Sequence, residues 1–300
     1  MKWRKKLILT IMLTLLISSF NNRELSNQEM PFDEDYDIEE FIEHFHEEYK
    51  KETFENALND LYLFKDYLIE IKENLDLPTT LESPSRNLRD IEELRGKPLI
   101  LLTFDDGPIP GTTSRFLDEL EQRNARVTFF VLGTNAALHP DIMIRAFNNG
   151  HTIASHAYEH KELTRLTDEE IRFQINKANE ILYEHLGIHN NLLRPPYGSV
   201  NDRVMEIASS SIALWNVDPL DWADRDANII YNRIVSSASH GAIVVLHDIH
   251  PTTIDASIRA IDTLLEMGFA VISWEEAISL GYINSEENEK VFSLSLTKNE

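Results

Sequence analysis

The chain contains no cysteine, so disulfide bonds and thiolate metal ligands are excluded. Any metal ion that it binds must be held by histidine, aspartate or glutamate side chains. Positive charge is also scarce, since 28 lysines and arginines stand against 51 aspartates and glutamates in 300 residues. This balance argues against a nucleic-acid polyphosphate as a partner. It leaves a neutral or cationic polymer open.

The amino terminus lacks an apolar run of the length that a typical membrane-spanning helix needs, about 20 residues. Its apolar stretch covers only residues 7–20 and follows a basic start, Met-Lys-Trp-Arg-Lys-Lys. This order is typical of an export signal, and we assign residues 1–22 to a signal peptide or signal anchor. Because no clear small-residue cleavage site follows, a membrane tether through residues 7–20 stays open. Either form predicts an extracytoplasmic protein, secreted or anchored at the cell wall.

Residues 23–96 form a distinct acidic region. Apolar side chains recur at helical spacing between about residues 37 and 75, with Glu and Asp on the other face. This pattern predicts an α-helical stalk, and the segment that contains Pro78 and Pro84 reads as a linker. A spacer is the simpler interpretation of the stalk, and a docking element for the cell wall or a partner is the alternative.

From residue 97 to about residue 283, short apolar runs alternate with helical segments. Strands are expected at residues 99–103, 126–132, 151–155, 191–193, 212–217, 242–246 and 269–273. Helices are expected at residues 113–124, 141–148, 168–186, 200–209, 227–239, 253–267 and 275–280. This alternation predicts an α/β fold with a parallel sheet and helices outside it. Seven or eight such units in under 200 residues favour a compact β/α barrel over an open doubly wound sheet. Residues 284–300 are expected to be a polar tail.

Asp105 and Asp106 stand at the end of the first predicted strand, which Gly107-Pro108 terminates. Neighbouring carboxylates repel each other, so they usually share a cation or take separate roles. Taken alone, such a pair is more often an acidic turn. Polar residues at the other strand ends favour the functional interpretation, because catalysis in a β/α barrel occurs at that face.

His156 and His160 follow the third predicted strand, and their spacing lets both imidazoles face one point in a helical turn. Neutral imidazole is a favoured ligand for zinc and similar ions. One carboxylate from Asp106 would complete a His-His-Asp set. A solvent-facing helix is the alternative for the histidine pair taken alone.

Three later strand ends add further candidates. Arg194 precedes two prolines that fix an extended backbone, so it could be held rigidly against a carboxylate; a structural turn is the alternative. Trp222 follows Asp221, and an indole beside acids suits a sugar site. His247 could serve as an acid if Asp221 raises its pKa.

Together these segments resemble the polysaccharide deacetylase family, which is the NodB-homology domain of carbohydrate esterase family 4. Five motifs carry the resemblance in order: Thr103-Phe-Asp-Asp-Gly-Pro108, His156-x3-His160, Arg194-Pro-Pro-Tyr-Gly198, Asp218-x2-Asp221-Trp222 and His247. It implies a distorted (β/α)7 barrel over residues 97–283, here preceded by the α-helical segment, and a monomer. The layout is most similar to bacterial peptidoglycan or chitooligosaccharide N-deacetylases.

The resemblance also implies a role for each matching residue. The catalytic set comprises the general base, the residue that orients it and the pair that supplies the acid: Asp105, Arg194, Asp221 and His247. The metal set would hold a divalent ion, most often Zn²⁺, with Co²⁺ or another divalent ion as alternatives: Asp106, His156 and His160. The substrate-binding set includes an oxyanion donor, the Tyr197 backbone N–H, and pocket walls: Tyr197, Trp222, Val245 and Pro196.

Two positions depart from the family's usual pattern. Ala157 stands where a Ser or Thr hydroxyl usually helps to hold the metal-site loop. Val245 replaces the usual pocket leucine, which removes one methylene worth about 1 kcal/mol of burial. We therefore expect the pocket to persist and the rigidity of the metal loop to be in question.

The resemblance implies a metal-dependent hydrolase that removes N-acetyl groups from N-acetylglucosamine-type residues of peptidoglycan or chitin-like oligosaccharides and releases acetate. The nearest alternative is an O-acetyl esterase on xylan that uses the same site. A catalytically idle glycan-binding protein is a third reading, and the departure at Ala157 is its only support.

Overall fold

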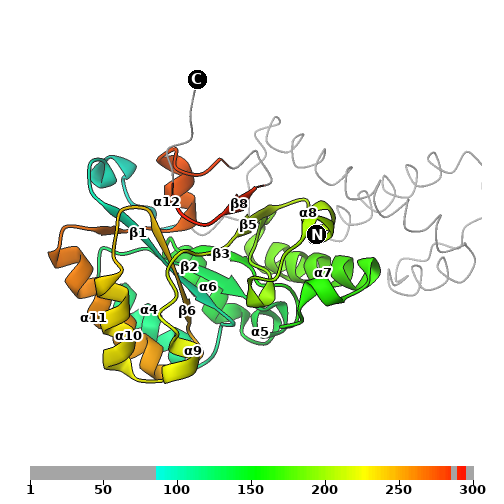
Figure 1. The fold of residues 1–300 in the computed structure, drawn as a ribbon, viewed down its shortest axis with the longest axis horizontal. Coiled ribbons are helices and arrows are strands. Elements are labelled where there is room, and N and C mark those ends of the chain that lie inside the picture. Colours follow the sequence, from blue (N-terminus) through cyan, green and yellow to red (C-terminus); the bar gives the residue numbers. More distant parts are fainter. Residues whose placement is uncertain (1–85, 285–288, 295–300) are drawn as a thin grey trace, which may run out of the picture. The chain divides into compact units, whose positions relative to one another are not determined.

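The computed structural model describes residues 86–284 and 289–294, which form one sheet surrounded by helices (Figure 1). All strand pairings in this part of the chain are parallel. The strands are β1 (Leu99–Asp105), β2 (Thr128–Val131), β3 (Thr152–Ser155), β4 (Leu192–Leu193), β5 (Ser211–Ala213), β6 (Ala242–His247), β7 (Ala270–Val271) and β8 (Lys290–Val291).

The strand order is β6-β1-β2-β3-β4-β5-β8, and β7 also pairs with β1. Beyond β5 the chain pairs once more, at Val217, with Val244 of β6. This bridge brings the strand order back to its start, so the sheet curls into a distorted barrel. The predicted (β/α)7 barrel is therefore confirmed.

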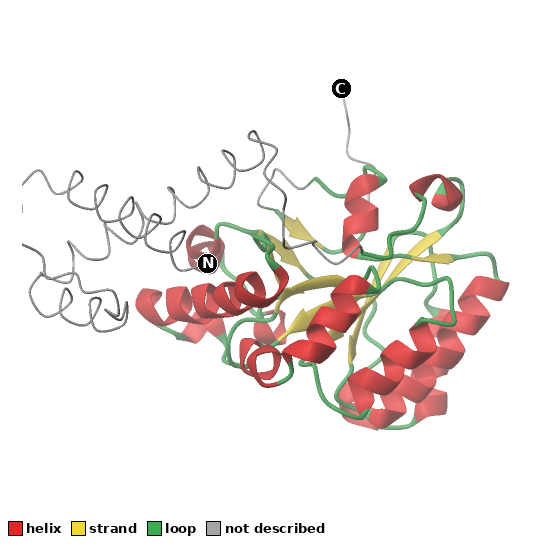
Figure 2. Cartoon of the chain, turned by 180° about the vertical axis from the view of Figure 1, so that it is seen from behind, coloured by secondary structure: helices red, strands yellow, loops and turns green. Residues whose placement is uncertain are grey.

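Helices lie along the outer side of the curled sheet (Figure 2). They are α4 (Thr112–Leu120), α5 (Gly133–Leu138), α6 (Pro140–Asn148), α7 (Asp168–Leu186), α8 (Asp202–Ala208), α9 (Asp221–Asp224), α10 (Ala227–Ser236), α11 (Pro251–Glu266) and α12 (Trp274–Ser279). Short 3₁₀ turns lie at Ile91–Leu94, Leu163–Arg165 and Pro196–Gly198. No helix in the described ranges is long and apolar enough to cross a membrane.

Strand β1 shows why the first apolar run is continuous rather than alternating. All seven of its residues are buried. Ile100, Leu102 and Phe104 belong to the apolar cluster shared with α4 and α11, while Leu99 and Leu101 pack in a second cluster with Phe130 and Trp274. A strand covered on both faces loses the alternation that a half-exposed strand would show.

Helix α7 has the bounds that the sequence predicts, because local signals fix both of its ends. The Thr167 side chain accepts a hydrogen bond from the Glu170 N–H, and the Glu170 carboxylate accepts one from the Thr167 N–H. This capping box starts the helix. Gly187 ends it in the left-handed conformation, with φ 68°.

Three regions differ from the sequence predictions. The strand expected at residues 212–217 ends at Ala213, because the chain then turns toward its bridge with β6. The predicted polar tail, residues 284–300, contains β8, which pairs with β5 and buries Val291 and Leu294. The short helices α5 and α9 were not expected, since neither is long enough to show a periodic pattern.

The predicted linker also differs at its end. Arg86 donates hydrogen bonds to the carbonyl oxygens of Phe147 and His151, so this part of the chain is bound to the barrel before residue 97. The expected signal (residues 1–22) and helical stalk lie outside the described residues.

Candidate active site and metal centre

The predicted catalytic and metal-binding residues gather at the carboxyl ends of the strands. Asp105 and His247 end β1 and β6 as register partners. His156 follows β3, and Arg194 follows β4, which pairs with β3 through Ser155 and Leu193. Parallel strands place their carboxyl ends at one rim, so segments far apart in sequence meet there.

Asp105 is held by a buried arginine. Its Oδ1 lies 2.8 Å from Nη1 of Arg194, which also donates to Thr103 Oγ1 at 2.7 Å. Nε and Nη2 of Arg194 donate to the carbonyl oxygens of Ala213 and Leu214. Burial lowers the pKa of Arg194, and the charge of Asp105 opposes that shift. Four hydrogen bonds thus fix the guanidinium, and Asp105 Oδ2 is left to face the site.

Asp106 faces two imidazoles instead. Its Oδ1 lies 3.6 Å from Nε2 of His156 and 3.6 Å from Nε2 of His160. The three ligand atoms lie within 4.8 Å of one another. Asp106 Oδ1 is buried and has no hydrogen-bond partner among the described residues, which is costly unless another group occupies that side. A divalent metal ion fits this donor set.

The tautomer of His156 suits a metal ligand. Its Nδ1 lies 2.7 Å from the carbonyl oxygen of Arg194. Because a carbonyl only accepts, Nδ1 carries the hydrogen and the Nε2 lone pair is free on the side of Asp106. Burial lowers the pKa of His156, which keeps the imidazole neutral.

Backbone strain concentrates around these residues. Asp106 (φ 78°), Ala157 (φ 65°), Tyr197 (φ 63°) and Leu220 (φ 57°) all have left-handed backbones although none is glycine. Such conformations persist only where the surrounding structure imposes them. They turn the chain sharply beside Asp105, His156, Arg194 and Asp221, which aims side chains into the site.

The loop with Ala157 is held through its backbone. The Ala157 N–H donates to Ser155 Oγ at 3.1 Å, and the Ala157 carbonyl accepts from Gly133 N at 2.9 Å. Thr134 N donates to the Tyr158 carbonyl at 3.0 Å. These contacts fix the loop without a hydroxyl at residue 157.

Asp221 and His247 form a second buried pair. Asp221 Oδ1 lies 2.9 Å from Nδ1 of His247, and Oδ2 accepts from the His247 N–H and Thr253 Oγ1, both at 2.8 Å. Burial lowers the pKa of His247, but the hydrogen bond and charge of Asp221 outweigh it and raise that pKa to about 9. Burial raises the pKa of Asp221, and its hydrogen bonds to His247 and Thr253 lower it overall.

The model for the family described as "Polysaccharide deacetylase" matches residues 93–211 of this chain. A solved structure of the peptidoglycan deacetylase PdaC from Bacillus subtilis is 36% identical to it, with a TM-score of 0.60, covering 63% of this chain and 91% of that one. This chain belongs to the polysaccharide deacetylase family.

Two curated members of the polysaccharide deacetylase family extend this result. The peptidoglycan-N-acetylmuramic acid deacetylase PdaC of Bacillus subtilis is 34% identical over 225 residues, which is 75% of this chain and 47% of that protein. A chitooligosaccharide deacetylase of Bradyrhizobium is 33% identical, covering 60% of this chain and 87% of that protein. The chain thus spans about half the length of the Bacillus subtilis protein.

The predicted substrate-binding residues of this family member differ in exposure. Tyr197 is 66% exposed, and its ring lies edge-on to His160, with ring centroids 4.4 Å apart. The Tyr197 N–H makes no hydrogen bond to other described residues. Trp222 is half-exposed in α9 beside Asp221, whereas Pro196 and Val245 are buried.

Sequence reasoning missed Thr253 and Asp248, which no motif marks. Thr253 enters from α11 to bind Asp221. Asp248 is fully buried, accepts from Thr113 Oγ1 at 2.5 Å, and packs so closely on Gly107 that a Cβ there would lie 2.3 Å from its Oδ2. Burial, with the charges of Asp106 and Asp105 adding to it, raises the pKa of Asp248 to about 7. The only sequence signal for Asp248 is its position directly after His247.

Proposed function

We propose that this chain is a divalent-metal-dependent N-deacetylase that acts on N-acetylated glycans and releases acetate. The observation that carries the proposal is that two adjacent carboxylates face different partners. Asp105 is bound by Arg194 at 2.8 Å, while the buried Asp106 Oδ1 faces two imidazoles. One acid is thereby kept as a base and the other as a metal ligand.

Amide hydrolysis is difficult because the carbonyl is a poor electrophile and the amine a poor leaving group. When bound by Asp106, His156 and His160, a divalent ion would polarise the carbonyl and lower the pKa of water to about 7. Asp105 takes the proton of the attacking water on Oδ2, since Arg194 holds Oδ1.

The other groups of the site stabilise the intermediate and the leaving amine. The Tyr197 N–H donates to the oxyanion of the tetrahedral intermediate. His247 donates a proton from Nε2 to the departing nitrogen, because Asp221 holds Nδ1 at 2.9 Å and keeps the ring protonated. The products are acetate and a glucosamine-type amine. Trp222 and Val245 would line the acetyl pocket.

The printed names of the relatives support glycans of the peptidoglycan and chitooligosaccharide classes as substrates. For this chain we propose peptidoglycan, acted on outside the cytoplasm, with Zn²⁺ as the first candidate ion. A xylan esterase is less well supported, because the relatives that are 33–36% identical carry deacetylase names for other glycans. An idle protein is less well supported too. Asp105 is bound by Arg194 at 2.8 Å and His247 by Asp221 at 2.9 Å, and the ligand atoms of Asp106, His156 and His160 lie within 4.8 Å of one another.

The test is acetate release from intact peptidoglycan, N-acetylglucosamine oligomers and acetylated xylan. Asp105→Asn should lower the rate on the preferred glycan by at least about 100-fold, since it removes the general base. Asp202→Asn, an exposed acid at the start of α8, is the matched control and should leave the rate unchanged. Equal rates for wild type and Asp105→Asn would sink the proposal, and acetate from xylan alone would replace it with the esterase.

A further inference from the structure

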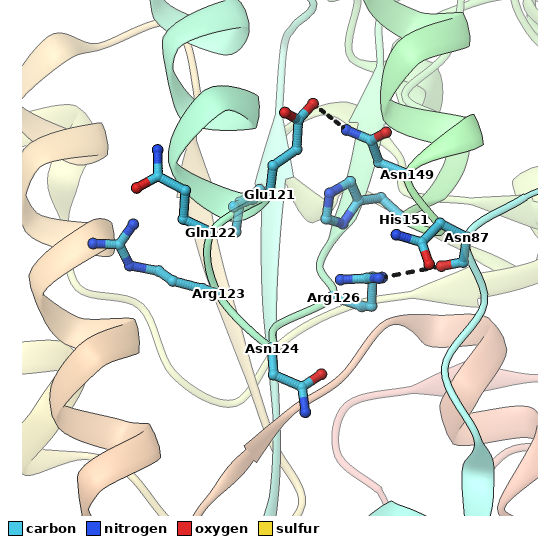
Figure 3. A pocket seen from close by; sticks show the side chains of 9 residues that line it. Asn87, Glu121, Gln122, Arg123, Asn124, Arg126, Asn149 and His151 are labelled. Atoms are coloured by element: carbon cyan, nitrogen blue, oxygen red, sulfur yellow. Dashed lines mark hydrogen bonds between the residues drawn. The ribbon is translucent and has the colours of Figure 1, made fainter.

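A pocket lies beside the amino ends of β2 and β3, and Figure 3 shows the side chains that line it. Arg126 and His151 line it just before β2 and β3 begin, whereas the catalytic residues follow the strands' carboxyl ends. Its volume is about 270 Å³, and the lining residues are Asn87, Leu120, Glu121, Gln122, Arg123, Asn124, Arg126, Asn149 and His151. No residue of the pocket belongs to the proposed active site.

Arg126 is a buried cation without a carboxylate partner among the described residues. Its side chain donates from Nη1 to the Ala125 carbonyl at 3.0 Å and from Nη2 to the Asn87 carbonyl at 3.2 Å. Nε is buried and has no hydrogen-bond partner there. The residue is only 8% exposed, so its positive charge is poorly compensated by water. A buried charge of this kind is costly unless a counter-charge meets it.

The neighbouring arginines are paired, which sets Arg126 apart. Arg86 lies 2.8 Å from Glu275, and Arg89 lies 2.6 Å from Glu276. The two carboxylates in this corner of the barrel therefore pair with two of its three arginines. The remaining positive charge is that of Arg126.

His151 adds a neutral donor of fixed orientation. Its Nδ1 accepts a hydrogen bond from the Val127 N–H at 3.2 Å, so Nε2 carries the hydrogen. Within the described ranges this Nε2–H has no acceptor. Burial first, and then the charges of Arg126, Arg89 and Arg86, lower the pKa of His151 to about 3. The ring is thus uncharged, and the potential around it is positive.

Three acceptors near the pocket are bound by other side chains. Glu121 Oε1 accepts from Arg145 at 2.6 Å and from Asn149 at 2.8 Å, as Figure 3 shows for Asn149. The carbonyl of Asn124 accepts from Arg89 at 2.8 Å. The Phe147 carbonyl at the end of α6 accepts from Arg86 at 3.1 Å. These groups do not neutralise Arg126.

We propose that this pocket binds a small oxyanion of the phosphate class, held by the charge of Arg126 and the Nε2–H of His151. Charge-assisted hydrogen bonds from arginine suit phosphate oxygens. The volume of about 270 Å³ exceeds what a bare oxyanion fills, so a phosphate ester also fits. This site is independent of the proposed deacetylase activity.

The test titrates the full chain with inorganic phosphate or glycerol phosphate at constant ionic strength, with chloride as the reference salt. Binding is followed by the thermal midpoint and by the NMR resonance of the Arg126 Nε–H. A saturable rise of the midpoint and a saturable shift of that resonance are expected. Tighter binding of inorganic phosphate identifies a free anion as the ligand, and tighter binding of glycerol phosphate identifies an ester.

Three variants locate the effect. Arg126→Gln and His151→Asn should each weaken binding by about tenfold or more. The asparagine side chain can still accept from the Val127 N–H, but it is too short to place a donor where the Nε2–H of His151 lies. Arg123→Gln is the matched control, since Arg123 lines the same pocket but is bound by Asp262 and Glu119. It should change affinity by less than about threefold. Absence of saturable binding in wild type, or full binding in both Arg126→Gln and His151→Asn, would overturn the proposal.

Discussion

The carbonyl oxygen of Arg194 lies 2.7 Å from Nδ1 of His156, while the guanidinium of the same residue lies 2.8 Å from Oδ1 of Asp105. One residue therefore orients a proposed metal ligand through its main chain and the proposed base through its side chain. The two prolines that follow Arg194 fix the backbone that makes both contacts. Substitution of the side chain separates the two effects, because the carbonyl remains.

Replacing Arg194 with Gln should abolish activity and destabilise the fold, because it leaves the buried Asp105 carboxylate without its cation. Breaking one partner of a buried pair typically costs about 3–5 kcal/mol. Urea unfolding measures this loss, and acetate release measures activity. The double variant Arg194→Gln/Asp105→Asn is the control: it should recover much of the stability and none of the activity. A single variant as stable as wild type would contradict the role of the pair.

Removal of the proposed divalent ion should abolish acetate release and lower the thermal midpoint. Asp106→Ala should weaken metal affinity by at least about 100-fold, because the Oδ1 that faces His156 and His160 is lost. Competition with a metal indicator measures that affinity. His185→Gln, which changes a histidine in the last turn of α7, serves as control. Unchanged affinity in Asp106→Ala would show that the ion binds elsewhere.

The pH dependence should reflect the pair Asp221–His247. The folded-state pKa of His247 is raised from 6.5 to about 9. Its contribution to stability, roughly 3 kcal/mol, is therefore fully present below pH 6.5 and is lost as the pH rises through about 9. Activity should fall over the same alkaline range as the acid loses its proton. Rate and unfolding measurements between pH 6 and 10 test both statements.

Asp221→Asn tests whether the fall of activity at high pH, the alkaline limb of the pH profile, comes from His247. It removes the carboxylate that raises the His247 pKa, so the limb should move down toward about pH 6.5. Thr253→Val, which deletes one hydrogen bond to Asp221 Oδ2 and keeps the carboxylate, should shift it less. A limb that stays near pH 9 in Asp221→Asn would assign the titration to another group.

The sequence predicted the fold where local signals were strong. The bounds of α7 follow from its capping box and Gly187, and the buried strand β1 follows from its continuous apolar run. Strand β8 has only two residues, and it is a strand because β5 offers an open edge beside it. That pairing depends on distant segments, so periodicity could not reveal it.

The candidate metal cluster was predictable because local sequence signals mark its members. His156 and His160 share one local segment, and Asp106 lies at a strand end that parallel pairing brings close. Thr253 and Asp248 were not predictable, because a threonine in a helix and an acid after a histidine carry no spacing signal. Their importance comes from burial against Asp221 and Gly107, which only the fold creates.

Asp248 should make the protein less stable as the pH rises toward neutrality. Its pKa is raised from 3.8 in an unfolded chain to about 7 in the fold. The folded state therefore binds the proton more tightly, and its stabilising effect is complete below pH 3.8 and lost as the pH rises through about 7. Asp248→Asn keeps an acceptor for Thr113 Oγ1 and has no charge to bury. It should be more stable than wild type by up to roughly 4 kcal/mol at pH 8.

Urea unfolding of the chelated protein at pH 4, 6 and 8 measures this difference. Below pH 4 the two proteins should have nearly equal free energies of unfolding, because the carboxyl is then neutral in both states. Asp202→Asn is the control, since an exposed acid at the start of α8 should give no pH-dependent gain. Curves for wild type and Asp248→Asn that stay parallel from pH 4 to 8 would show that Asp248 is not protonated in the fold. In that case the Asp248 carboxylate would be ionised in the fold, and a cation near Gly107 would have to balance its charge.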